Sequence, residues 1–98
     1  MNKQIALITG ATSGIGEACA RKFAEGGYNL ILTGRNAQKL NAIAAELQQT
    51  GVEVAALVFD VRQAEAAHKA WEGLDAAWQQ VDVLINNAGL ALGLEKEY

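Results

Sequence analysis

A glycine-rich stretch near the start of the chain constrains the fold more than any other feature of the sequence. Residues 9–16 read Thr-Gly-Ala-Thr-Ser-Gly-Ile-Gly, and they join an apolar run at 5–8 to a helix-forming segment at 17–24. Glycines allow the backbone to turn sharply and to approach a ligand closely. The N–H groups and the positive dipole end of a helix that begins here would face an anion. The stretch therefore predicts a strand, a phosphate-binding turn and a helix.

The spacing of these glycines separates this loop from two better-known phosphate loops. The fingerprint G-x-G-x-x-G is absent because Cys19 stands where its third glycine would fall, and no Gly-Lys-Ser/Thr follows Gly10 as a Walker loop requires. The chain has T-G-x-x-x-G-x-G instead, and with this spacing it resembles the short-chain dehydrogenase/reductase family. An ordinary glycine-rich turn is the alternative. The resemblance implies a cofactor-binding loop made of Gly10, Ala11, Thr12, Ser13, Gly14, Ile15 and Gly16.

Length and composition limit the classes of protein that remain. A chain of 98 residues allows one domain, and 51% hydrophobic residues are usual for a globular protein. A net charge of −3 and the lack of a basic run provide no electrostatic footprint for nucleic acid. No apolar stretch approaches the length of a membrane span, the first residues lack the apolar pattern of a signal peptide, and the single cysteine suits a reducing compartment. We therefore expect a cytoplasmic protein that binds neither nucleic acid nor a membrane.

Short apolar runs alternate with helical patterns along the whole chain. We expect strands at 4–9, 29–33, 52–59 and 81–86, and helices at 14–25, 37–49 and 63–80. Such alternation predicts a parallel sheet with right-handed crossovers and with both faces buried.

Each predicted helix has an apolar face that we expect to pack on the sheet. In the first helix this face consists of Ile15, Cys19 and Phe23, which makes Cys19 a small buried hydrophobe rather than a nucleophile. In the second and third helices the apolar positions are Leu40, Ile43, Ala44 and Leu47, then Ala67, Trp71, Leu74, Trp78 and Val81. An interaction surface is the alternative for the third helix. His68 lies off this face, and no second His or Cys is placed to share a metal with it.

The residues after the second predicted strand favour a phosphorylated dinucleotide. Ligands of open parallel sheets bind at the carboxyl ends of the strands, and Arg35 and Asn36 follow one such end. An NAD-preferring site usually has Asp or Glu here, whereas a guanidinium pairs with a 2′-phosphate. Arg35 therefore predicts NADP(H), and NADP-preferring members of the resembled family often carry Arg at this place. A solvated arginine beside the Asn36 helix cap is the alternative.

Two further motifs follow the third and fourth predicted strands. Residues 86–89 read Asn-Asn-Ala-Gly and match a motif of the resembled family, in which the small residues Ala88 and Gly89 let the backbone approach the cofactor ribose. The resemblance implies that Asn87 reaches the cofactor. It also implies that Asp60 accepts a hydrogen bond from the adenine amino group and that the Val61 backbone lies along the adenine. From the residues alone, Asp60 is equally a turn or helix-capping residue.

The resemblance implies an α/β fold, namely a Rossmann-type doubly wound parallel sheet with strand order 3-2-1-4. Residues 1–98 would be the dinucleotide-binding half of a single domain. The chain lacks the Tyr-x-x-x-Lys pair that family members use for hydride transfer, so we name no catalytic residue and predict that the chain alone is inactive. With its fourth strand at an edge, the chain alone is also expected to be marginally stable or to oligomerise.

The segment that follows the Asn-Asn-Ala-Gly motif narrows the resemblance. Residues 90–93 resemble NADP-dependent 3-hydroxy acid dehydrogenases of the serine or allo-threonine type. An intact member would interconvert a hydroxyl and a carbonyl on a small substrate and would be a homo-oligomer. The alternatives are a non-catalytic dinucleotide-binding module and an inert truncated product.

Overall fold

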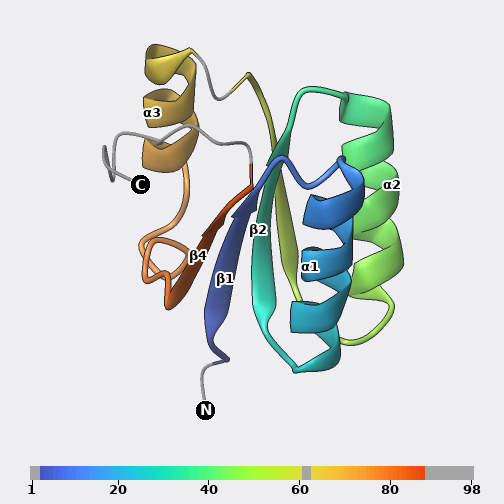
Figure 1. Ribbon diagram of the computed structural model, residues 1–98. Helices are drawn as coiled ribbons and strands as arrows, with labels where there is room; N and C mark the ends of the chain where they lie inside the picture. Colours follow the sequence, from blue (N-terminus) through green and yellow to red (C-terminus); the bar gives the residue numbers. More distant parts are fainter. Residues whose placement is uncertain (1–2, 61–62, 88–98) are drawn as a thin grey trace.

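A four-stranded parallel sheet lies between two layers of helix in the computed structural model, which describes residues 3–60 and 63–87 (Figure 1). The strands are ordered β3-β2-β1-β4. The elements in chain order are β1 (Ile5–Thr9), α1 (Gly14–Glu25), β2 (Asn29–Gly34), α2 (Ala37–Gln48), β3 (Val54–Val58), α3 (Ala64–Glu72) and β4 (Val83–Asn86). The predicted Rossmann-type α/β fold and its 3-2-1-4 order are therefore confirmed.

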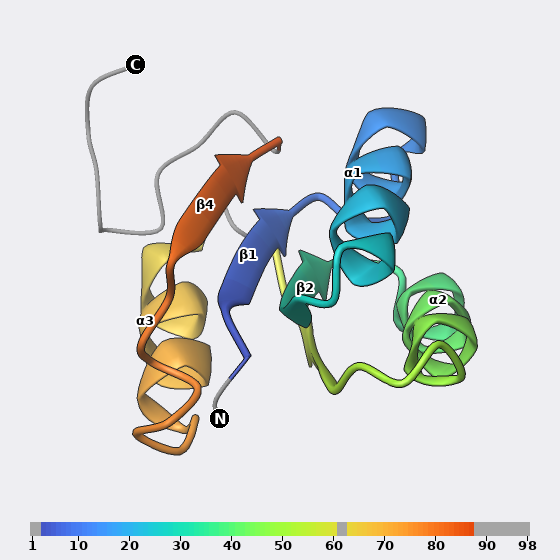
Figure 2. The same cartoon turned by 90° about the horizontal axis from the view of Figure 1, so that it is seen from below.

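Helices cover both faces of the sheet. Figure 2 shows α1 and α2 on one face and α3 on the other. Alternate residues of β1 point to opposite sides, as the pleat of a strand requires. Ala6 and Ile8 belong to the core beneath α1 and α2, whereas Ile5 and Leu7 belong to a second core with Trp71. Strand β1 is thus buried on both faces, which explains its uninterrupted apolar sequence.

Helix α1 presents its smallest residues to the sheet. Its buried positions are Gly16, Ala20 and Ala24, whereas Cys19 is only partly buried against the same core. The expected inward position of Ile15 is wrong, because this side chain is 72% exposed. Successive helical residues rotate by about 100°. The residues of α1 that face the sheet are therefore Gly16, Ala20 and Ala24, each of which directly follows a residue of the predicted apolar face.

Helix α2 follows the sequence pattern closely. Its N-terminal cap is Asn36, whose Oδ1 accepts a hydrogen bond from the Lys39 N–H at 3.0 Å. All members of the predicted apolar face are buried, namely Leu40, Ile43, Ala44 and Leu47. Both the cap and the packing face of this helix are confirmed.

Helix α3 is shorter than the apolar pattern predicts. The expected helix at 63–80 is wrong in length, because the helix stops at Glu72 and Gly73 forms its C-cap. Beyond it, Leu74 and Trp78 still pack against the sheet from a segment of turns. The Gln79 Nε2 donates to the carbonyl of Leu74 at 3.3 Å and to that of Trp71 at 2.9 Å, which stabilises this non-helical path. The expected packing on the sheet is confirmed, although the helical conformation is not.

Strand β4 is joined to β1 at its start by a carboxylate. The Ile5 N–H donates to Oδ2 of Asp82 at 2.8 Å, and the Asp82 N–H donates to the Ile5 carbonyl at 2.9 Å. The register then pairs Thr9 with Asn86 at the other end of the two strands. Within the ranges that the structure describes, no helix combines the length and the apolar character needed to cross a bilayer.

Candidate functional site

The predicted binding residues that the structure describes gather where the four strands end (Figure 1). Hydrogen bonds join three of the loops at this edge. The Ala11 N–H, after β1, donates to the Thr33 carbonyl in β2 at 2.9 Å, and the Phe59 N–H, after β3, donates to the Gly34 carbonyl at 3.0 Å. The parallel order β3-β2-β1-β4 thus brings residues far apart in the sequence into one continuous surface.

The loop after β1 is a tight turn that closes on its own first residue. Gly10 has a φ of 62°, a backbone conformation that residues with a Cβ rarely adopt. Its carbonyl accepts hydrogen bonds from the Ser13 N–H at 3.1 Å and from the Ser13 hydroxyl at 3.0 Å. The Ser13 Oγ in turn accepts from the Gly16 N–H at 3.2 Å and caps α1. Ser13 therefore fixes both the turn and the start of the helix.

The other two glycines of the loop lie in opposite surroundings. A Cβ on Gly16 would lie 2.2 Å from the Gly10 carbonyl oxygen and 2.8 Å from Nδ2 of Asn87, so no larger residue fits without a shift of the backbone. A Cβ on Gly14 would meet no atom within 4 Å in the described structure. Gly16 is thus required by packing within the protein, whereas Gly14 borders open space.

The start of α1 offers hydrogen-bond donors to that open space. Among the described residues, no hydrogen-bond partner is found for the N–H groups of Gly14 and Ile15, whereas Ser13 accepts those of Gly16 and Glu17. Free N–H groups at a helix N-terminus, together with the helix dipole, favour an anion. The loop therefore has the donors and the space to hold a phosphate group.

Asn87, at the end of β4, braces this loop. Its Nδ2 donates to the Gly10 carbonyl at 3.0 Å and to the Ser13 Oγ at 2.7 Å. Its neighbour Asn86 accepts a hydrogen bond from the Thr9 hydroxyl at 3.0 Å. The contact with Thr9 and the particular contacts of Asn87 with the loop were not predicted from the sequence, although the 3-2-1-4 order, which makes β1 and β4 neighbours, was the available signal. Contact between Asn87 and a cofactor stays a prediction.

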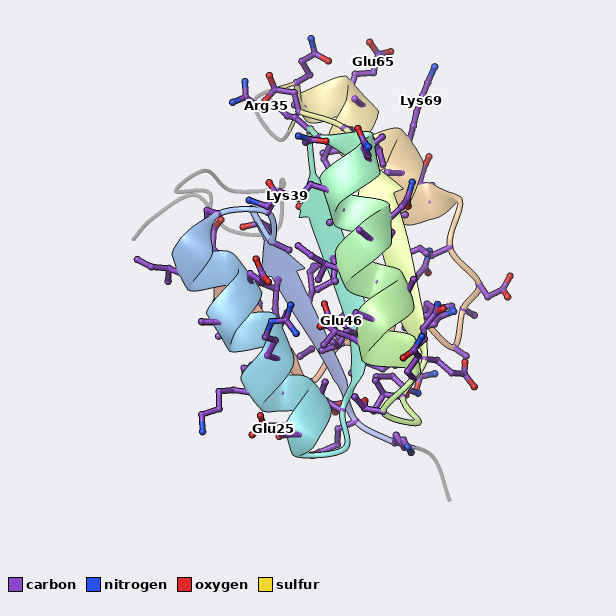
Figure 3. All side chains as sticks on the ribbon, turned by 90° about the vertical axis from the view of Figure 1, so that its right-hand side faces the viewer. Glu25, Arg35, Lys39, Glu46, Glu65 and Lys69 are labelled. Atoms are coloured by element: carbon purple, nitrogen blue, oxygen red, sulfur yellow. The ribbon has the colours of Figure 1, made fainter. Side chains whose placement is uncertain are left out.

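Arg35 lies at the same edge, after β2, and its side chain is 69% exposed. Its Nη1 is 3.8 Å from Oδ2 of Asp60, which follows β3 and is 21% exposed. Gly34 allows β2 to approach the loop, because a Cβ there would lie 3.1 Å from Cγ2 of Thr12. The side chain of Asn36 caps α2, and a cofactor contact for this residue stays a prediction. Figure 3 shows Arg35 at the opposite end of the molecule from Glu25.

Three of the predicted binding residues cannot be placed. Val61, Ala88 and Gly89 lie outside the described residues. In the parts of the chain that are described, no three His, Cys, Asp or Glu residues gather as a metal site requires. His68 pairs instead with Glu72 at 2.9 Å on an exposed surface.

Comparison with known proteins identifies a family and several proteins that this chain resembles. A family model described as short chain dehydrogenase matches residues 4–97. The NADP-dependent 3-hydroxy acid dehydrogenase YdfG of Salmonella typhi is 48% identical over 91 residues, which make up 93% of this chain and 36% of that protein. Serine 3-dehydrogenase of Agrobacterium fabrum is 49% identical over 87 residues, 89% of this chain and 34% of that protein. The chain thus spans about a third of the length of these curated relatives.

Solved structures of similar proteins share the fold at substantial sequence identity. An L-sorbose reductase from Gluconobacter frateurii, complexed with NADPH and L-sorbose, has a TM-score of 0.81 and 34% identity, covering 91% of this chain and 34% of that one. An alcohol dehydrogenase from Thermococcus sibiricus, complexed with 5-hydroxy-NADP, has a TM-score of 0.78 and 42% identity, covering 85% of this chain and 36% of that one.

Proposed function

The chain belongs to the short chain dehydrogenase family, and from this premise we propose that it is the NADP(H)-binding portion of a short-chain oxidoreductase. The observation that carries the proposal is that an open phosphate loop lies beside an exposed arginine that follows the neighbouring strand β2. The N–H groups of Gly14 and Ile15 would hold the pyrophosphate, and Arg35 would hold the 2′-phosphate. These residues fit the cofactor because the space beside Gly14 is open.

The remaining predicted contacts complete the proposed site. Asp60 and Val61 would contact the adenine, while Ala88 and Gly89 would pass beside the ribose, as the family resemblance implies. Asn87 would act mainly by holding the loop in its binding shape, since its amide already donates twice to that loop. In this proposal, residues 1–98 are the dinucleotide-binding half of one domain.

NADP(H), when bound, supplies or accepts the hydride that interconverts a hydroxyl and a carbonyl. The named relatives support a small hydroxy acid as the substrate of the intact enzyme, since one is a 3-hydroxy acid dehydrogenase and another a serine 3-dehydrogenase. The Tyr-x-x-x-Lys pair is not among these 98 residues. We therefore expect the chain to bind NADPH without oxidising it, even with a 3-oxo acid present, and the absorbance of NADPH monitors this directly.

Titration with NADPH and NADH tests the proposal, because Trp71 and Trp78 provide an intrinsic fluorescence signal. The wild-type chain should bind NADPH more tightly than NADH. Replacement Arg35→Gln should weaken NADPH binding by about tenfold, the worth of a charge-assisted hydrogen bond, and leave NADH nearly unchanged. Lys22→Gln, an equal charge change at the exposed last turn of α1, is the matched control. Equal loss of both dinucleotides in Arg35→Gln would contradict the proposal.

A further inference from the structure

The arginine on which the proposed cofactor preference depends has a carboxylate beside it. Strands β2 and β3 place the two groups together, because Gly34 pairs with Val58 in the last register position of these strands. Arg35 follows Gly34 directly, and Asp60 stands two residues after Val58. The hydrogen bond from the Phe59 N–H to the Gly34 carbonyl keeps the two chain segments side by side just after the last paired residues. The proximity of Arg35 and Asp60 is therefore fixed by the backbone.

The contact between the two side chains is weak enough to be exchanged. At 3.8 Å, Nη1 of Arg35 and Oδ2 of Asp60 attract each other by charge and are too far apart for a hydrogen bond. The guanidinium is mostly exposed, and exposed ion pairs of this kind are screened by water and salt. A phosphate that reaches Arg35 can instead form two parallel charge-assisted hydrogen bonds.

We propose that Asp60 limits the selection of NADP(H) by competing with the 2′-phosphate for Arg35. The inference rests on the proposed function, since it assumes that Arg35 receives this phosphate. The phosphate must bind Arg35 beside a fixed carboxylate that both neutralises the guanidinium and repels the incoming anion. A dinucleotide without the 2′-phosphate meets neither effect. Asp60 is then a specificity-determining residue that acts through Arg35, in addition to any contact it makes with adenine.

Two small nucleotides isolate this effect. Adenosine 2′,5′-bisphosphate and 5′-AMP differ only in the 2′-phosphate, so the ratio of their dissociation constants cancels every contact to adenine, ribose and 5′-phosphate. Calorimetric titration should show that Asp60→Asn raises the preference for the bisphosphate by about two- to fivefold, the range expected for one exposed ion pair. Asparagine retains an acceptor oxygen of similar size, which preserves local hydrogen bonding. Asp60→Ser provides a second neutral side chain, with the same expected result.

The same measurement in an Arg35→Gln background tests whether Asp60 acts through Arg35. There, Asp60→Asn should change the ratio by clearly less than it does in the wild type, because the group for which the anions compete is gone. An equal change in both backgrounds would overturn the competition. Glu25→Gln removes one negative charge at the opposite end of the molecule (Figure 3) and should leave the ratio unchanged.

The outcomes separate this inference from the function on which it rests. A wild-type chain that binds both nucleotides equally would overturn the proposed NADP(H) site and the competition with it. A wild-type chain that prefers the bisphosphate, with a ratio that Asp60→Asn leaves unchanged or lowers, would overturn the role of Asp60 alone. A ratio that is raised in both neutral variants of Asp60, and raised clearly less in the Arg35→Gln background, supports the role of Asp60.

Discussion

The loop after β1 and the arginine after β2 lie on the same edge of the sheet but are built in different ways. The loop is fixed by hydrogen bonds from Ser13 and Asn87 to the Gly10 carbonyl, and Ala11 and Gly16 within it are buried. Arg35 extends into solvent, and its Nη1 lies 3.8 Å from Oδ2 of Asp60. In the proposed site, the loop binds the pyrophosphate that all dinucleotides share, whereas Arg35 reads the one phosphate that distinguishes them.

This difference predicts that the loop for the common pyrophosphate is also needed for folding, whereas the side chain that selects the 2′-phosphate is not. A change at a loop residue that is packed within the protein, such as Gly16, should disturb folding and weaken the binding of both dinucleotides, because the same groups serve both purposes. A change at Arg35 should alter one dinucleotide only, because the side chain supports little else. Four predictions probe this contrast, from the largest expected effect on folding or binding to the smallest.

Gly16→Ala should have the largest effect. The added methyl group would lie 2.2 Å from the Gly10 carbonyl oxygen, so the helix start and the loop must move apart. We expect a loss of about 2–3 kcal/mol in the free energy of unfolding, as in other overpacked sites, together with weaker binding of NADPH and NADH alike. Urea unfolding followed by tryptophan fluorescence measures the first effect. A variant as stable as the wild type would show that the loop is not rigid.

Asn87→Ala should come second. It removes both hydrogen bonds that the amide donates to the loop, which should cost about 1–2 kcal/mol of stability. Because the brace serves the pyrophosphate loop, NADPH and NADH should lose affinity by the same factor. Asn41→Ala, the same change at an exposed position of α2, is the matched control. Selective loss of NADPH would instead place Asn87 in the recognition of the 2′-phosphate.

Gly14→Ala should separate binding from stability within the loop. A methyl group here would lie more than 4 Å from the other described parts of the protein that surround the helix, and alanine favours a helix. The unfolding free energy should stay equal or rise, by at most about 1 kcal/mol, while both dinucleotides bind less well because the methyl group occupies the space proposed for the pyrophosphate. Unchanged binding would argue against a phosphate at this position.

The sequence predicted the parts of the site that depend on local chain conformation. The spacing of Gly10, Gly14 and Gly16 predicted the turn and the helix start, and Asn36 was recognised as a cap because its position before an apolar helical pattern is a local signal. One wrong prediction concerns which side of a helix faces the sheet. Ile15 has the spacing of an apolar helical face, but only packing decides which of two adjacent faces of the helix lies against the sheet.

The third helix shows why an apolar period is insufficient evidence for helix length. Trp71, Leu74 and Trp78 continue the helical spacing, yet Gly73 ends the helix and the later side chains reach the sheet from turns. Contacts between loops also could not be predicted from the sequence around each loop. The meeting of Arg35 with Asp60 depends on the strand register, which the order 3-2-1-4 limits but does not specify residue by residue.

A second arginine, Arg21, which is partly buried, allows the last test of the comparison. The Nη2 of Arg21 lies 2.8 Å from Oε1 of Glu46 and 2.6 Å from Oε2 of Glu17, linking α1 to α2. These hydrogen bonds, with Glu46 first, raise the pKa of Arg21, and the same contact lowers the pKa of Glu46 below its ordinary 4.5. The contribution of Glu46 is thus complete above its ordinary pKa and is lost as the pH falls through the lowered value.

Thermal unfolding of the wild type and Glu46→Gln should reveal this small contribution. The wild type should be slightly more stable at about pH 7, and the difference should shrink as the pH falls through the lowered pKa of Glu46, because the carboxyl group is then neutral in both the folded and the unfolded wild type. The melting-temperature difference should be smaller than those of Gly16→Ala and Asn87→Ala, since the Glu46 side chain is 60% exposed. The preference for NADPH over NADH should not change, because Arg21 lies on helix α1 outside the proposed site. A difference in stability that persists at low pH would show that Glu46 acts through packing rather than through charge.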